Sequence, residues 1–144
     1  MAALLGRPAE GDLETLVRFG IQTARAIGSP AYPAPEDRLR TTIMRDIQRS
    51  FYPAGLARQF AAIVADGDRR ERLKAVTAPT LVIHGEADPL VPVEGGRDTA
   101  ASIAGAKLHT IAGMGHDLPV ELVDERYSSA VLRARRGEII DAVL

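Results

Sequence analysis

The stretch "PTLVIHGEADPLVP" (residues 79–92) decides the fold that this sequence predicts. Its first half is a short apolar run, rich in β-branched residues and without polar alternation, which is typical of a parallel strand buried on both faces. Pro79 suits the first position of such a strand. We therefore expect a strand over residues 80–84, followed by a turn that carries Asp88.

A second unit of the same kind follows this turn. Residues 93–105 suit a short helix that Gly105 would end, and "KLHTIA" (residues 107–112) suits another short strand. The alternation of strand and helix indicates a parallel α/β sheet. The expected fold class is therefore α/β, with two strands joined through a helix.

The loop after the second strand, "AGMGHDLP" (residues 112–119), contains two glycines and carries His116. Pro119 is placed for the first turn of a last helix, with Asp117 as its cap. The carboxyl ends of parallel strands meet at one sheet edge, where ligand sites of open α/β sheets lie. Asp88 and His116, 28 residues apart, are thus expected at the same edge.

Residues 1–67 are expected to be helical, because apolar residues recur there at spacings of three and four. Asp12 is placed to cap the first helix and Gly28 to end it. A loop containing Pro30, Pro33 and Pro35 follows, since helix interiors do not tolerate proline. Two further helices are expected on either side of "FYPAG", and Gly67 is placed to end the second of them.

The composition limits the possible functions. The chain has 144 residues, 46% of them hydrophobic, and a net charge of -1, which describes one globular domain or a piece of a larger one. So small a charge gives no field to attract nucleic acid or an anionic membrane. The absence of cysteine excludes disulfides, thiolate catalysis and zinc–thiolate sites. With neither a leader peptide nor an apolar run of membrane length in this sequence, we expect a cytoplasmic protein without membrane contact.

The order of motifs resembles one known superfamily. This part of the sequence is similar to the C-terminal part of the α/β-hydrolases. The similarity lies in a strand ending in His-Gly-x-x-Asp-x-x-Val-Pro, followed by a helix, a strand and a Gly-x-Gly-His loop. The run "YPAGLARQFAAIVADGDRRERLKAVTAPTLVIHG" resembles bacterial esterase-type members, including the aclacinomycin methylesterase subgroup. The resemblance implies an incomplete domain, in which residues 1–67 form a helical cap or lid. Residues 68–144 would then carry the last two βα units of the core sheet.

The same resemblance assigns roles to the two site residues. It implies a nucleophile–His–Asp triad that hydrolyses small-molecule carboxylic esters without a cofactor or metal, with His116 as base and Asp88 as acid. The chemistry has a physical basis, because a hydroxyl is a poor nucleophile at neutral pH and needs an imidazole base within hydrogen-bonding distance. A carboxylate on the other ring nitrogen fixes the tautomer and stabilises the imidazolium.

The third member of the triad is missing from the sequence. In this fold the nucleophile precedes the acid, on a Gly-x-Ser-x-Gly turn between strand and helix, and no such motif occurs here. Ser29 and Ser50, the serines before Asp88, follow no strand. We therefore expect the nucleophile in an N-terminal portion outside this sequence, and an inactive chain in its absence. The alternative is a non-catalytic binding or complementing module, which would pair with a separate N-terminal half or with itself.

These residues allow two other interpretations. Asp88 could simply cap the backbone of its turn, as Asp-Pro turns often do. A metal site could gather His84, Asp88, His116 and Asp117, but no pair of them has a tight metal-binding spacing on one element. His84, at the end of a strand, is more typical of a packed structural histidine.

Overall fold

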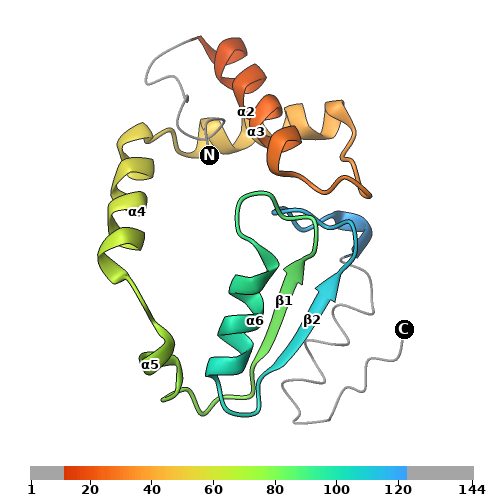
Figure 1. The fold of residues 1–144 in the computed structure, drawn as a ribbon. Coiled ribbons are helices and arrows are strands. Elements are labelled where there is room, and N and C mark those ends of the chain that lie inside the picture. Colours follow the sequence, from red (N-terminus) through yellow and green to blue (C-terminus); the bar gives the residue numbers. More distant parts are fainter. Residues whose placement is uncertain (1–11, 123–144) are drawn as a thin grey trace.

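The computed structural model describes residues 12–122. The last helix that the sequence predicts lies mostly beyond residue 122 and so outside the described residues. The elements in chain order are α2 (Leu13–Ile27), α3 (Glu36–Arg49), α4 (Pro53–Asp66), α5 (Arg70–Leu73), β1 (Leu81–Gly85), α6 (Val93–Ser102), β2 (Lys107–Ile111) and the 3₁₀ helix η1 (Val120–Leu122) (Figure 1). The predicted order, helices first and then a βα unit with a second strand, is confirmed.

Local signals in the sequence set the ends of the helices. The carboxylate of Asp12 accepts a hydrogen bond from the Thr15 amide at 2.7 Å and so caps α2 as predicted. Helix α4 begins at Pro53, and Gly67 ends it with a φ of 59°, a conformation that favours glycine. Helix α2 ends before Gly28, whose φ of -72° is an ordinary extended value, so this glycine has another role.

The two strands form a parallel pair. Leu81 lies opposite Lys107 and Gly85 opposite Ile111, so both strands end at the same edge. Helix α6 makes the crossover and packs against both strands. A Cβ atom on Gly96 of α6 would lie 2.7 Å from the ring of His84, which shows how closely this helix approaches β1. His84 is thus a packed residue, and its Nδ1 lies 3.0 Å from the Gly85 carbonyl oxygen.

Two details of the sequence prediction were wrong. Residues 81–84 of β1 are half-buried rather than buried, because α6 is the only element of residues 12–122 that packs extensively on the strands. Helix α6 ends at Ser102 and not near Gly105, because Ile103 is extended and buried. The last helix predicted after Pro119 lies mostly beyond residue 122 and is not tested; the described part of it forms the 3₁₀ helix η1. The carboxylate of Asp117, predicted as the cap of that helix, accepts a hydrogen bond from Ser29.

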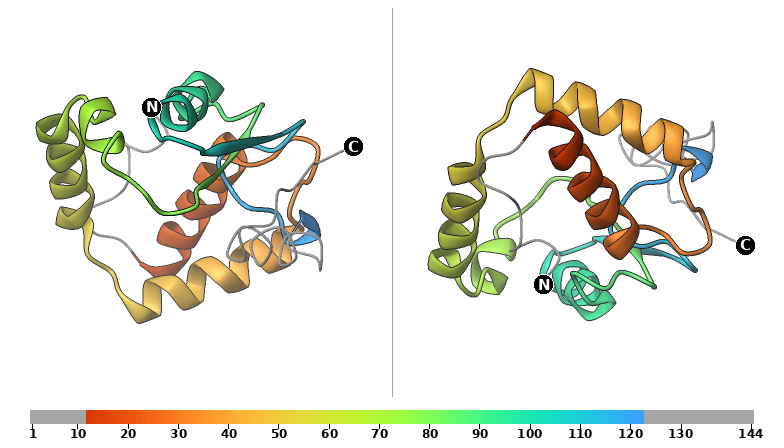
Figure 2. Two further views of the ribbon diagram at one scale, coloured as in Figure 1. Left: turned by 90° about the horizontal axis from the view of Figure 1, so that it is seen from below. Right: turned by 90° about the horizontal axis from the view of Figure 1, so that it is seen from above.

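The buried apolar side chains fall into two groups. One lies on α2, and the other lies next to the strands and the loop after β2 (Leu16, Val17 and Ile21; Ile103, Ile111 and Met114). Helices α3 and α4 have no buried residue. Helix α4 lies apart from the strands in every view, whereas the carboxyl end of α2 reaches the edge where both strands end (Figures 1 and 2). The helical segment therefore meets the sheet at the edge that carries Asp88 and His116.

Candidate active site

Asp88 is held by the turn that follows β1. One carboxylate oxygen, Oδ1, accepts hydrogen bonds from the amides of Leu90 at 2.8 Å and Val91 at 2.9 Å. The side chain is only 5% exposed. The capping role considered for Asp88 is therefore real, but it occupies a single oxygen. The second oxygen, Oδ2, is directed at His116.

His116 lies in the loop after β2. Gly113 turns this loop with a φ of 70°, in the region that favours glycine. The backbone amide of His116 donates to the Ile27 carbonyl at 2.8 Å. Its ring Nδ1 lies 2.9 Å from Oδ2 of Asp88, and the side chain is 40% exposed. The structure thus brings together the two residues that the sequence analysis singled out.

The electrostatics of Asp88 favour its charged form. Burial raises the pKa of this carboxyl group, but hydrogen bonds from the Val91 amide, the His116 ring and the Leu90 amide outweigh it. The net effect is a pKa below the ordinary value of an aspartate. Asp88 is therefore a carboxylate at neutral pH and accepts the proton of Nδ1 in a hydrogen bond.

This arrangement leaves one ring nitrogen available for proton transfer. When Nδ1 of His116 carries the proton and donates to Asp88, Nε2 keeps a lone pair on the opposite side of the ring. A half-exposed imidazole oriented in this way is able to take a proton from a hydroxyl or water, and to return it to a leaving group. The pair is suited to general acid–base chemistry.

Ser29 does not complete the pair in this structure. Ser29 lies near the loop of His116, but it is only 4% exposed, and its hydroxyl donates to Asp117 Oδ1 at 2.6 Å and accepts from the Gly115 amide at 2.8 Å. A nucleophile must be reached by substrate, and this hydroxyl is covered and fully engaged. Nothing local in the sequence indicates that residues 29 and 115 meet, so the contact of Ser29 with this loop could not be predicted from it.

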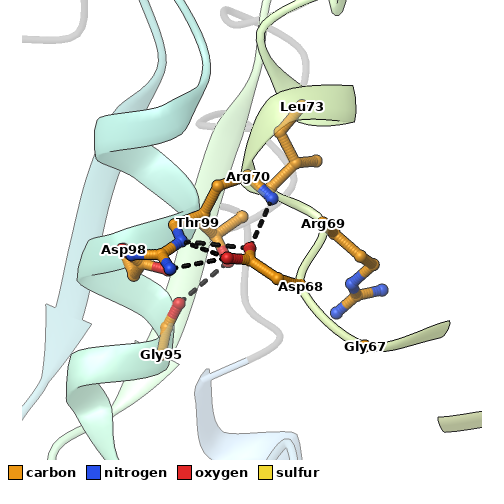
Figure 3. A pocket seen from close by; sticks show the side chains of 8 residues that line it. All are labelled: Gly67, Asp68, Arg69, Arg70, Leu73, Gly95, Asp98 and Thr99. Carbon is orange, nitrogen blue, oxygen red and sulfur yellow. Dashed lines mark hydrogen bonds and ion pairs between the residues drawn. The ribbon is translucent and has the colours of Figure 1, made fainter. Parts of the chain in front are cut away.

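A cavity of about 390 Å³ lies elsewhere, between the residues after α4 and helix α6 (Figure 3). Its lining includes Asp68, Arg70 and Asp98, but neither Asp88 nor His116. Arg70 is directed at Asp68, and their hydrogen bonds lower the pKa of Asp68 to about 2. The charges of this cavity thus neutralise one another, and it offers no group for the chemistry of the Asp88–His116 pair.

Two negative findings apply to residues 12–122. No three histidine, aspartate or glutamate side chains gather there in a way that could hold a metal ion. None of the helices in this part of the chain is long and apolar enough to cross a lipid bilayer.

Comparison with known proteins gives consistent similarities. Residues 51–123 match the family described as serine aminopeptidase, S33. A rhodomycin D methylesterase of Streptomyces peucetius is 29% identical over 147 residues, covering 97% of this chain and 46% of that protein. A monoacylglycerol lipase of Mycolicibacterium smegmatis is 38% identical over 132 residues, covering 81% of this chain and 46% of that protein.

A solved structure is similar in fold. It is that of Est816, described as an N-acyl homoserine lactone degrading enzyme, with a TM-score of 0.52 and 21% sequence identity over 91% of this chain and 52% of that one. The chain therefore spans about half the length of the relatives it matches.

Proposed function

This chain belongs to the α/β-hydrolases of the serine aminopeptidase S33 family, and we propose on that premise that it supplies the histidine and the acid of a carboxylic-ester hydrolase. His116 is the general base and Asp88 holds its ring. The nucleophile comes from polypeptide outside the 144 residues, because this sequence contains no Gly-x-Ser-x-Gly turn. The observation that carries the proposal is the 2.9 Å contact between His116 Nδ1 and Asp88 Oδ2.

The reaction follows from the chemistry of the pair. Nε2 of His116 takes the proton of the nucleophilic hydroxyl as its oxygen attacks the ester carbonyl, and Asp88 stabilises the imidazolium that results. The imidazolium gives this proton to the departing alcohol, which leaves an acyl-enzyme. His116 then deprotonates water for the attack that releases the acid and regenerates the hydroxyl.

The proposal also assigns a role to each part of the chain. Residues 1–67 act as a cap, of which α2, α3 and α4 are described, and residues 68–144 contribute the end of the core sheet. The carboxyl end of α2 is hydrogen-bonded to the loop of His116, so the cap stands over the edge where a substrate would bind. Alone, the chain is inactive.

Carboxylic esters of small molecules are the proposed substrates. The names of the similar proteins, a methylesterase and a monoacylglycerol lipase, both denote cleavage of an ester bond. The aminopeptidase in the family's description denotes an amide bond, which the same acyl transfer would also cleave. The alcohol of an ester leaves more readily than the amine of an amide, so esters are the substrates to test first.

The test begins with the DNA upstream of the coding sequence, read in all three forward frames for an apolar strand followed by Gly-x-Ser-x-Gly. The encoded polypeptide is produced together with this chain and assayed with a short-chain p-nitrophenyl ester. We expect activity that His116→Ala abolishes and that Asp88→Asn lowers by about 10⁴-fold in kcat.

Matched controls separate the site from general damage. Asp98→Asn makes the same chemical change on the surface of α6, and His109→Gln changes a histidine on β2; both are expected to keep the activity within about twofold. The enzymatic proposal is contradicted if no Gly-x-Ser-x-Gly segment is encoded upstream, or if activity survives His116→Ala. The first of these outcomes favours the alternative, a non-catalytic binding or complementing module.

A further inference from the structure

The loop that carries His116 is held from two sides. On one side, the turn after β1 contacts it, since the Ala87 amide donates to the Met114 carbonyl at 2.9 Å. On the other side lies the end of α2 and the turn that follows it, residues 27–31. The amide of Ala31 donates to the Gly113 carbonyl at 3.1 Å, and that of His116 donates to the Ile27 carbonyl at 2.8 Å.

Ser29 lies at the centre of this second contact. Its hydroxyl donates to Oδ1 of Asp117 at 2.6 Å and accepts from the Gly115 amide at 2.8 Å, so it joins the residues on either side of His116. The side chain is 4% exposed. A hydroxyl buried to this extent is shielded from solvent, so removing it would leave the Gly115 amide without this acceptor.

The two backbones lie too close for larger residues. A Cβ atom on Gly115 would be 2.3 Å from the carbonyl oxygen of Gly28, and one on Gly113 would be 2.4 Å from the Ala31 side chain. Backbones in such contact leave the loop little room to shift. Any displacement of residues 27–31 would therefore move His116 relative to Asp88.

We propose that Ser29 is a positioning residue for His116, through which the end of α2 fixes the imidazole on Asp88. The proposal rests on the function proposed above and adds to it a residue from the helical segment. Ser29 does not touch the reacting atoms. It acts by keeping residues 115–117 in the one arrangement that places Nδ1 at 2.9 Å from Asp88 Oδ2.

The experiment uses the full chain labelled with ¹⁵N-histidine, which contains three histidines, so that His116→Gln identifies the resonance of interest. The ring N–H of His116, bonded to Asp88, is expected as a downfield signal that Asp88→Asn removes. In Ser29→Ala, we expect this proton to exchange with water about tenfold faster or its signal to broaden beyond detection, the order of effect for one lost buried hydrogen bond.

Two further variants make the result specific. Ser102→Ala removes a hydroxyl that donates only within α6, to the Asp98 carbonyl, and is expected to leave the His116 signal unchanged. Asp117→Ala removes the acceptor of the Ser29 hydroxyl but leaves the Gly115 amide satisfied, so we expect a smaller change in the same direction. In the reconstituted hydrolase, Ser29→Ala is expected to lower kcat about tenfold while KM changes less than twofold.

The outcomes are distinct. A Ser29→Ala chain with the wild-type His116 signal and exchange rate overturns the proposal. If Ser29→Ala does not fold, Asp117→Ala provides the test. An unchanged His116 signal in Asp117→Ala also overturns the proposal. A reconstituted protein without esterase activity, in which Ser29→Ala still disturbs the His116 ring, contradicts the proposed function but supports the positioning role. A wild-type chain that circular dichroism shows to be folded, yet without the Asp88-dependent signal, contradicts both.

Discussion

Gly115→Ala is expected to separate the helical segment from the loop of His116. The added methyl carbon would lie 2.3 Å from the Gly28 carbonyl oxygen and 2.7 Å from that of Ile27, where real contacts exceed 3.0 Å. Both obstacles are backbone atoms, so no side-chain rotation relieves the clash. Either the loop or residues 27–28 must move, and the movement strains the bonds of the Gly115 and His116 amides.

The cost follows from these contacts. Overpacking of a close-packed site costs about 1–3 kcal/mol, and each strained buried hydrogen bond adds about 1 kcal/mol. With the two bonds of the Gly115 and His116 amides strained, we therefore expect the free energy of unfolding to fall by about 3–5 kcal/mol. Urea unfolding, followed by circular dichroism at low protein concentration, measures this quantity.

Gly95→Ala is the matched control. Its added methyl group would meet only Val91 Cγ1, at 3.5 Å, which is an ordinary contact in the first turn of α6. Alanine is favoured over glycine in a helix by up to about 1 kcal/mol, so this variant is expected to be as stable as the wild type or slightly more stable. Equal unfolding midpoints for Gly115→Ala and Gly95→Ala would refute the reasoning about the loop.

Two further predictions concern charge and association. The pKa of Asp88 is lower in the folded chain than in the unfolded one, so its ionised form stabilises the fold above about pH 4, and this stabilisation is lost as the pH falls through the folded-state pKa. Urea unfolding between about pH 2 and pH 6 should accordingly show a weaker pH dependence for Asp88→Asn, and an identical dependence would contradict the assignment. The chain alone is expected to self-associate and to be only weakly stable, because Ile63 and Val64 of α4 are 59% and 73% exposed. Val64→Glu should lower the mass found by sedimentation, whereas a monomeric wild type with a sharp cooperative melt would contradict the expectation.

The sequence predicted the elements best where the determining interactions are local. The Asp12 cap of α2 and the end of α4 at Gly67 each depend on residues within one helical turn. Burial of β1 was predicted wrongly for the opposite reason. An apolar run indicates a strand that can be buried on both faces. Whether both faces are in fact covered depends on packing partners far along the sequence.

The candidate site divides in the same way. Asp88 and His116 follow consecutive strands of a parallel pair, so the topology alone brings them to one edge, and their approach could be predicted. The contact of Ser29 with Asp117 could not, because 88 residues separate them and no repeating pattern connects a turn after a helix with a loop after a strand. The roles assigned to Asp88, His116 and Ser29 remain predictions that the proposed experiments test.

The two glycines before His116 show why a motif alone does not reveal its physical cause. Glycines beside a loop histidine are typical of a tight bend, and Gly113, with its φ of 70°, provides one. Gly115 has no positive φ and is required instead because the backbone of Gly28 lies against it. A glycine required for a bend is explained by the conformation of its own loop. A glycine required for close approach is explained only together with the segment that packs against it. The geometry of His116 is therefore determined jointly by the end of the sheet and by the end of α2.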